Sequence, residues 1–204
     1  MKPKIIFLTF LIASILTACE KSDLQYENEF ERSHKAWLEF KSMSGDTYCY
    51  KVTGSTWTGS SWLTTIYVRQ GQVVQRNFCY TIFNNVQRPT RGWNLADADE
   101  LIQHTGMTQE EFLENFGYPF HEALEWVETE KSLGTKGYSP ASPLYTMDDI
   151  YALAKSDWLK KRADAQVIFE TNNNGMISAV GYVPDGCADD CFNGMHIESI
   201  EYLY

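Results

Sequence analysis

The chain has 204 residues, of which 44% are hydrophobic and 14% aromatic, and its formal net charge at pH 7 is −10. This composition excludes intrinsic disorder, and the length suits one domain with a substantial core rather than two. The negative charge argues against nucleic acid and against electrostatic adhesion to anionic lipid, because both ligands present phosphates that an acidic surface repels.

The first stretch of the chain is a short basic segment followed by an apolar one. Lys2 and Lys4 precede residues 5–16, which carry no charge. A membrane-spanning helix needs roughly 17–25 apolar residues, whereas this run has the length of a signal-peptide core. It ends in the sequence Leu16-Thr17-Ala18-Cys19, which resembles the lipobox of bacterial lipoproteins.

The lipobox resemblance implies a lipidated mature protein. Cys19 would carry a thioether-linked diacylglycerol, the chain would be cut before it, and the new amine would be acylated, for example with palmitate. We therefore expect residues 1–18 to be a signal peptide, 19–26 a lipidated tether and 27–204 a single domain. The expected location is the bacterial cell envelope, at the outer membrane in a Gram-negative cell, since two or more acyl chains anchor stably. The alternative is an ordinary signal peptide with an incidental cysteine.

The first elements of the domain are a helix and a strand. Residues 27–43 place apolar side chains at near-helical spacing, and the pair Gly45-Asp46 ends the pattern. Residues 47–53 alternate, with Tyr48, Tyr50 and Val52 on one face. This period is typical of a half-buried strand.

Next comes a predicted β-hairpin whose strands are residues 62–69 and 72–83, joined by a tight turn. Pairing residue 69 with residue 72 places Trp62 opposite Cys79. The loop before the hairpin, residues 54–61, is rich in turn formers and contains Trp57. Trp57 in this loop and Trp62 directly after it are the candidate ligand-binding residues, because indole rings stack on sugars. Trp57 is the better exposed candidate, whereas a tryptophan on a strand, such as Trp62, is more often a core residue.

Residues 84–145 are expected to be a helical insertion. Helices are predicted over 94–104, over 108–116 and over 122–133, with loops between them. The second begins with Thr108 and Glu111, which have the spacing of a capping box.

The last part of the chain returns to strands. A helix over 146–161, capped by Thr146, precedes strands 166–171 and 176–183, and the turn sequence Asn-Asn-Asn-Gly between them predicts a hairpin. A final strand covers 195–204. The fold class expected is α+β, an antiparallel sheet of two three-stranded groups with helices packed on one face.

These elements also resemble a family of bacterial lipoproteins of unknown function. The resemblance lies in a tryptophan-bearing helix, the strand Tyr48-Cys49-Tyr50, the spacing of Val68, Gly71 and Val73, and a later helix that precedes a hairpin. No activity is established for that family, so the resemblance implies no catalytic residue.

Four cysteines follow Cys19, and an even number in an exported chain predicts two disulfides. Cys187 and Cys191 lie in one turn-rich loop, which leaves Cys49 and Cys79 to pair by elimination. In a simple meander these two lie two strands apart, roughly 9–10 Å, which is too far for a disulfide. Either the first strand lies beside the third or the cysteines pair otherwise; a four-cysteine zinc site is a weaker alternative.

The sequence contains no recognisable catalytic, phosphate-binding or dinucleotide-binding motif, so we predict no cofactor, no metal and no catalytic residue. His104, His121 and Glu125 could meet a metal, and the acidic loop 185–194 could bind calcium, but solvated histidines and turn chemistry explain these residues equally well.

The sequence therefore favours a lipid-anchored, non-enzymatic binding or structural module of the envelope, with a protein or glycan partner. The alternatives are an envelope hydrolase that uses His104 or His121 with Asp97, and a glycan-binding surface lipoprotein.

Overall fold

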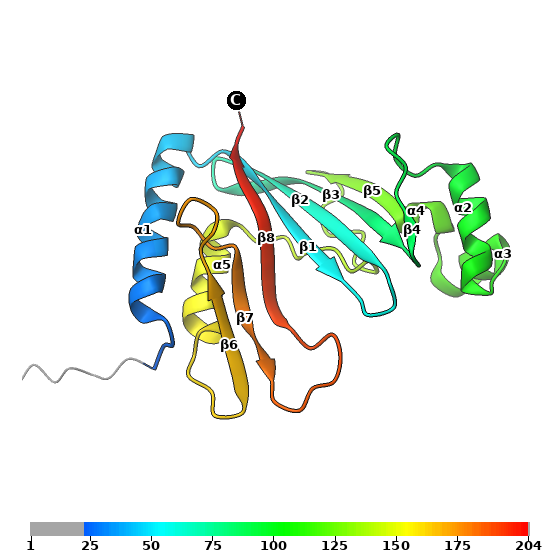
Figure 1. Ribbon diagram of the computed structural model, residues 1–204. Helices are drawn as coiled ribbons and strands as arrows, with labels where there is room; N and C mark the ends of the chain where they lie inside the picture. The colour runs from blue at the N-terminus through cyan, green and yellow to red at the C-terminus, as the bar shows by residue number, and fades with distance from the viewer. Residues whose placement is uncertain (1–22, 204) are drawn as a thin grey trace, which may run out of the picture.

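The computed structural model describes residues 23–203, so the predicted signal peptide and Cys19 lie outside the described residues. Eight strands form one antiparallel sheet in the order β4-β3-β2-β1-β8-β7-β6, with β5 paired to β3 (Figure 1). The strands are β1 Tyr48–Ser55, β2 Ser61–Arg69, β3 Gln72–Phe83, β4 Val86–Gln87, β5 Glu125–Thr129, β6 Ala165–Glu170, β7 Ala179–Pro184 and β8 Asn193–Tyr202.

The predicted α+β class is confirmed, and the two three-stranded groups join into one sheet. The first group is β1–β2–β3 and the second is β6–β7–β8; the ladder between β1 and β8 connects them. This single ladder makes neighbours of segments from opposite ends of the chain, and it also positions the candidate site described below.

Helix α1, Glu27–Ser44, covers one face of the sheet with α5, Met147–Leu153, which continues as the π-helical turn η2, Ala154–Trp158. We call this side of the sheet the helix face; Tyr48, Tyr50 and Ile66 point into it and are fully buried. Helix α1 ends at Gly45, as predicted, because Gly45 has a φ of 59° that a side chain would strain.

A second group of helices lies at the opposite end of the sheet from α1 (Figure 1). It consists of α2 Leu95–Leu101, the 3-10 turn η1 Ile102–Thr105, α3 Gln109–Phe116 and α4 Phe120–Leu124, and has its own buried apolar cluster. The capping box of Thr108 and Glu111 is formed as predicted, and so is the cap that Thr146 gives to α5.

The predicted helix over 122–133 is wrong. Helix α4 ends at Leu124, and Glu125–Thr129 forms β5, which pairs with β3. The strand alternates in burial, with Trp126 stacked on Phe78 and Glu128 fully buried beside Arg76. These long-range contacts outweigh the helical preference of the local sequence.

The domain begins earlier than the predicted boundary at residue 27. Leu24 is buried and forms an antiparallel bridge with Lys160, and Gln25 N donates to the carbonyl oxygen of Leu159 at 2.7 Å. Residues 24–26 of the expected tether are therefore attached to the folded domain.

Candidate functional site

The candidate site is a cleft where β1 and β8 separate. Their ladder runs from Tyr48 opposite Tyr202, which we call the closed end, to Thr53 opposite His196. Beyond that pair, β1 continues to Ser55 and β8 extends back to Asn193, and no register pair joins these described residues. We call this the open end; it borders a cleft of about 800 Å³.

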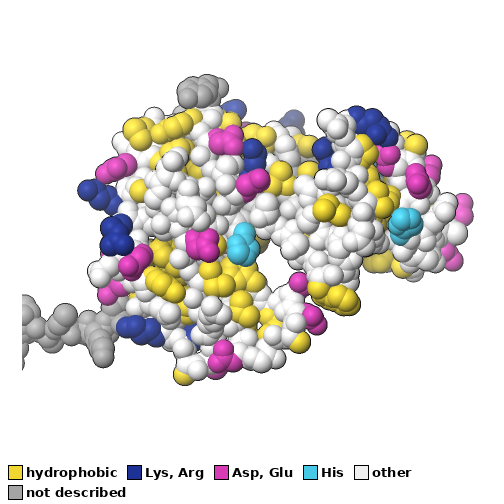
Figure 2. All heavy atoms as spheres, in the orientation of Figure 1, with side chains coloured by type: hydrophobic (Ala, Val, Ile, Leu, Met, Phe, Trp, Pro, Cys, Tyr) yellow, Lys and Arg dark blue, Asp and Glu magenta, His cyan; other side chains and the backbone are white. Residues whose placement is uncertain are grey.

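The separation is visible in both views of the molecule. Figure 1 shows β1 and β8 diverging toward the β1–β2 loop and the β7–β8 loop, and Figure 2 shows the surface hollowed in the same region. The cleft is lined by both strands, by the β1–β2 loop, by the β7–β8 loop and by residues 140–143. Parts distant in sequence thus meet at one concave surface.

Residues 140–143 lie against the helix face and close the cleft from that side. Ser142 N donates to Thr64 Oγ1 at 3.0 Å, and Arg76 Nη1 donates to the carbonyl oxygen of Ser142, also at 3.0 Å. Thr64 and Arg76 are buried side chains of the helix face. The segment is therefore anchored to the sheet through its backbone, and the cleft opens toward the other face.

A buried ion pair fixes the connection that carries this segment. Arg76 Nε donates to Glu128 Oε2 at 2.9 Å, and both side chains are almost completely buried. Glu128 also accepts from Gly134 N at 3.1 Å and from Lys136 N at 2.6 Å. One carboxylate thereby orders the connection after β5, while its guanidinium partner holds Ser142. A buried carboxylate needs several such hydrogen-bond donors to offset the cost of its desolvation.

The two predicted tryptophans have different places at the open end. Trp62 lines the cleft, and its indole lies against Gly54, where an added Cβ would come within 2.4 Å of the ring. Trp57 is 74% exposed at the rim, and its backbone N–H donates to Asp190 Oδ2 at 3.4 Å. Both belong to the same region, and only Trp57 presents a largely free ring.

The predicted pairing of Trp62 with Cys79 is wrong by one residue. Trp62 lies opposite Tyr80, and Leu63 lies opposite Cys79, because the register shifts between Tyr67 and Val68. A bulge of this kind places one extra residue on a strand and cannot be seen from turn geometry alone.

The carboxylates of the cleft belong to residues that the sequence analysis assigned to a turn or to a strand surface. Asp190 and Glu198 line the cleft, and so does His196, whose ring stacks on Phe192 with centroids 4.4 Å apart. Among the described lining residues there is no lysine or arginine. The sequence shows that His196 and Glu198 are two residues apart on one strand, but it does not show that β1 lies beside them.

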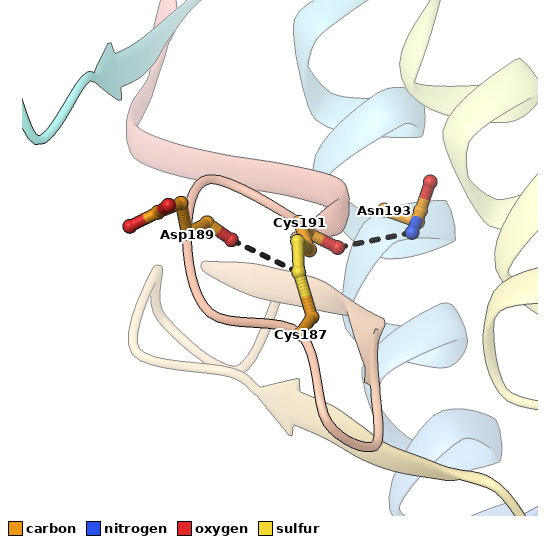
Figure 3. Close-up of a disulfide and its surroundings, with 4 residues drawn as sticks. All are labelled: Cys187, Asp189, Cys191 and Asn193. Atoms are coloured by element: carbon orange, nitrogen blue, oxygen red, sulfur yellow. Dashed lines mark hydrogen bonds between the residues drawn. A yellow bond between two sulfur atoms is a disulfide. The ribbon is translucent and has the colours of Figure 1, made fainter.

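The β7–β8 loop that carries Asp190 is closed by a disulfide between Cys187 and Cys191, the predicted loop pair (Figure 3). Their Cα atoms lie 6.3 Å apart, and Asn193 Nδ2 donates to the carbonyl oxygen of Cys191 at 3.0 Å. The disulfide closes the loop on itself, and the hydrogen bond ties it to the first residue of β8. The disulfide therefore restrains Asp190 at the edge of the cleft.

The pairing of Cys49 with Cys79 by elimination is wrong. Both are free cysteines, because β2 lies between β1 and β3 and Cys49 faces Tyr67 rather than Cys79. Burial raises the pKa of both thiols, and for Cys49 the carboxylate of Glu201 adds to this effect.

The candidate hydrolase residues have structural roles or are separate from the cleft. Asp97 Oδ2 accepts from Asn94 N at 3.0 Å as a helix cap and its Oδ1 accepts from Arg91 at 2.7 Å, while His104 lies in η1 and His121 in α4. Glu125, the candidate metal ligand, accepts two bonds from Arg88 and one from Trp93 N.

The net effect on Glu125 is a lowered pKa: burial acts to raise it, and the bonds from Arg88 and Trp93 outweigh that effect. Within residues 23–203, no three His, Cys, Asp or Glu side chains are grouped so as to hold a metal ion. In the same range, no helix is long and apolar enough to cross a membrane.

No family model, no curated protein and no solved structure matches the chain.

Proposed function

We propose that this protein is a lipid-anchored, non-enzymatic binding module of the bacterial cell envelope, and that the cleft at the open end is its binding site. The observation that carries the proposal is the divergence of β1 and β8. It leaves strand edges, aromatic rings and carboxylates around one cleft with a volume of about 800 Å³. Sites for ligands are typically concave, part apolar and furnished with a few polar groups.

The anchor part of the proposal rests on the basic and apolar leader and on Cys19. Because the folded domain includes Leu24, only residues 20–23 separate it from the proposed lipidated cysteine, a reach of at most about 17 Å. This short tether keeps the domain next to the bilayer, so the partner is a component of the same envelope.

A glycan is the second candidate ligand. The exposed indole of Trp57 and the neighbouring hydroxyl groups of Thr56 and Thr58 favour it, because sugars stack on aromatic rings and bond to hydroxyls. A glycan would use the rim of the cleft rather than its strand edges.

Site-specific photo-crosslinking in cells that produce the full-length protein tests the binding site. Ser55, an exposed cleft residue, is replaced by a photo-crosslinking amino acid, and Lys35, exposed on α1, serves as the matched control. We expect one constant crosslinked product from position 55 and none from position 35. Equal products from both positions, or none from position 55, would contradict a binding role for the cleft.

Membrane fractionation of Cys19→Ser tests the anchor. The variant is expected to lose its membrane association and its lipid modification, because serine cannot form the thioether. Normal maturation and membrane partitioning of the variant would refute the lipoprotein assignment.

A further inference from the structure

We infer that the cleft takes an extended, basic polypeptide segment, which adds as a short strand along the unpaired edges of β1 and β8. The inference rests on the proposed function and names the class of its ligand. Three properties of the cleft carry it: its strand edges, its charge and its apolar lining.

The first property is the unpaired backbone. Gly54 and Ser55 have register partners on β2, and Asn193 and Gly194 have partners on β7. On the sides that face each other, these described residues have no strand partner. An exposed edge presents N–H and C=O groups at the spacing of a strand, so an extended peptide satisfies them better than a compact ligand does.

The second property is charge. Asp190 and Glu198 both line the cleft, and no lysine or arginine is among the described residues that line it. The complete chain is also strongly acidic, with a formal net charge of −10. This field attracts a cationic segment and disfavours an acidic one, and it acts on both the rate and the specificity of association.

The third property is the apolar part of the lining. Trp62, Met195 and Phe192 provide it, and the anchored segment 140–143 closes the far side. Lysine suits this combination because its methylene stem covers apolar surface while its ammonium group remains beside a carboxylate. A neutral sugar would meet the rings but leave both the strand edges and the acids unused.

Fluorescence anisotropy with labelled peptides tests the inference on the full-length protein in nonionic detergent. The probe is a capped eight-residue peptide of alternating lysine and valine. One comparison peptide replaces every lysine by glutamate, and the other carries N-methyl groups on its valines, which removes N–H donors and keeps the charge. Each lost hydrogen bond weakens binding by roughly 2- to 10-fold, so we expect at least a 10-fold loss for the N-methylated peptide.

Charge variants of the protein form the second arm of the test. Asp190→Asn keeps an oxygen acceptor for Trp57 N and removes one cleft charge, and Glu198→Gln removes the other. Asp189→Asn is the matched control, since it makes the same charge change one residue away from Asp190, at a position outside the cleft lining. We expect about 3- to 10-fold weaker binding of the lysine peptide for each cleft variant, and less than about 2-fold for the control.

The outcomes separate this inference from the proposed function. Equal binding of the N-methylated peptide would refute strand addition, and equal binding of the glutamate peptide, or equal effects of Asp189→Asn and Asp190→Asn, would refute charge recognition. If the lysine peptide does not bind while the photo-crosslink at position 55 forms, the cleft remains a binding site and its ligand belongs to another class, the glycan included. If the crosslink also fails, the proposed function falls as well.

Discussion

The two ends of the β1–β8 ladder are built from opposite kinds of residue. At the closed end, Tyr48 and Tyr50 are fully buried, and Trp37 of α1 packs edge-on against Tyr48 with ring centroids 5.1 Å apart. At the open end, Gly54 and Ser55 follow Thr53, and the partner strand begins with Asn193 and Gly194. Large rings hold one end of the ladder together, and small polar residues leave the other end unpaired.

The hydrogen bonds at the two ends show the same contrast. Trp37 Nε1 donates to Asp148 Oδ1 at 2.8 Å, and the hydroxyl of Tyr48 accepts from Met147 N at 2.9 Å, so the closed end is tied to α5. The open end is held by a loop contact, from Trp57 N to Asp190 at 3.4 Å. One ladder therefore supplies stability at one end and an accessible surface at the other, and mutations at the two ends should affect different properties.

The largest expected effect comes from making the same substitution at both ends. Trp37→Ala removes a fully buried indole from the main core and should lower the free energy of unfolding by ~3–5 kcal/mol. Trp57→Ala removes a ring that is 74% exposed and should change it by less than about 0.5 kcal/mol. Urea unfolding followed by circular dichroism measures both. Equal losses would show that the open end is as much a part of the core as the closed end.

The next effect concerns the carboxylate that orders the connection behind the cleft. Glu128→Gln leaves Arg76 buried without a charged partner and should lower the free energy of unfolding by about 3 kcal/mol. Glu201→Gln is the matched control, because Glu201 pairs with Lys51 at a half-exposed site, where such a pair contributes about 0–1 kcal/mol. A similar cost for the two variants would mean that the Arg76–Glu128 pair is not buried in solution.

A smaller effect is expected from the disulfide of the β7–β8 loop. Replacing both Cys187 and Cys191 by serine should lower the free energy of unfolding by at most about 2 kcal/mol, since the closed loop is short. The same variant should also bind the lysine–valine peptide more weakly, and this loss should be clearer than the loss of stability, because Asp190 is no longer restrained beside the cleft. Thermal melts and anisotropy on the same samples separate the two effects; unchanged peptide affinity would show that the disulfide does not position Asp190.

The buried hydroxyl of Tyr151, in α5, should also affect how stability responds to alkaline pH. Burial raises the pKa of Tyr151 to about 12, above the unfolded value near 10. Between these values the unfolded chain loses a proton that the folded protein keeps, so stability falls as the pH rises from 10 to 12. Tyr151→Phe should cost about 1–2 kcal/mol at pH 8, through lost bonds with Ser33, and should make the alkaline decline shallower. Urea midpoints at pH 8, 10 and 11 measure this; an unchanged slope would argue against burial of the hydroxyl.

Much of the fold could be predicted because its signals are local. The cap at Thr108, the stop at Gly45 and the β2–β3 turn each depend on residues within one turn of chain, and all are present in the structure. β5 was missed because its local sequence resembles a helix, and only pairing with β3 makes Glu125–Thr129 a strand.

The candidate site could be predicted only in part. Trp57 and Trp62 were identified from the loop between them, whereas Asp190, His196 and Glu198 depend on the β1–β8 ladder. That ladder joins the two halves of the chain, and its formation depends on tertiary packing rather than on any local motif.

The most direct check on strand order uses Cys49 and Cys79, the free thiols among the described residues. Because burial raises the pKa of Cys49 and of Cys79, less thiolate forms at pH 8, and native alkylation should be slower than for free cysteine. In denaturant without reductant, peptide mapping should find Cys49 and Cys79 modified, with Cys187 still joined to Cys191. A disulfide between Cys49 and Cys79 would instead require β1 to lie beside β3. The observed strand order β3-β2-β1-β8 would then be wrong, and with it the arrangement of the strands around the cleft.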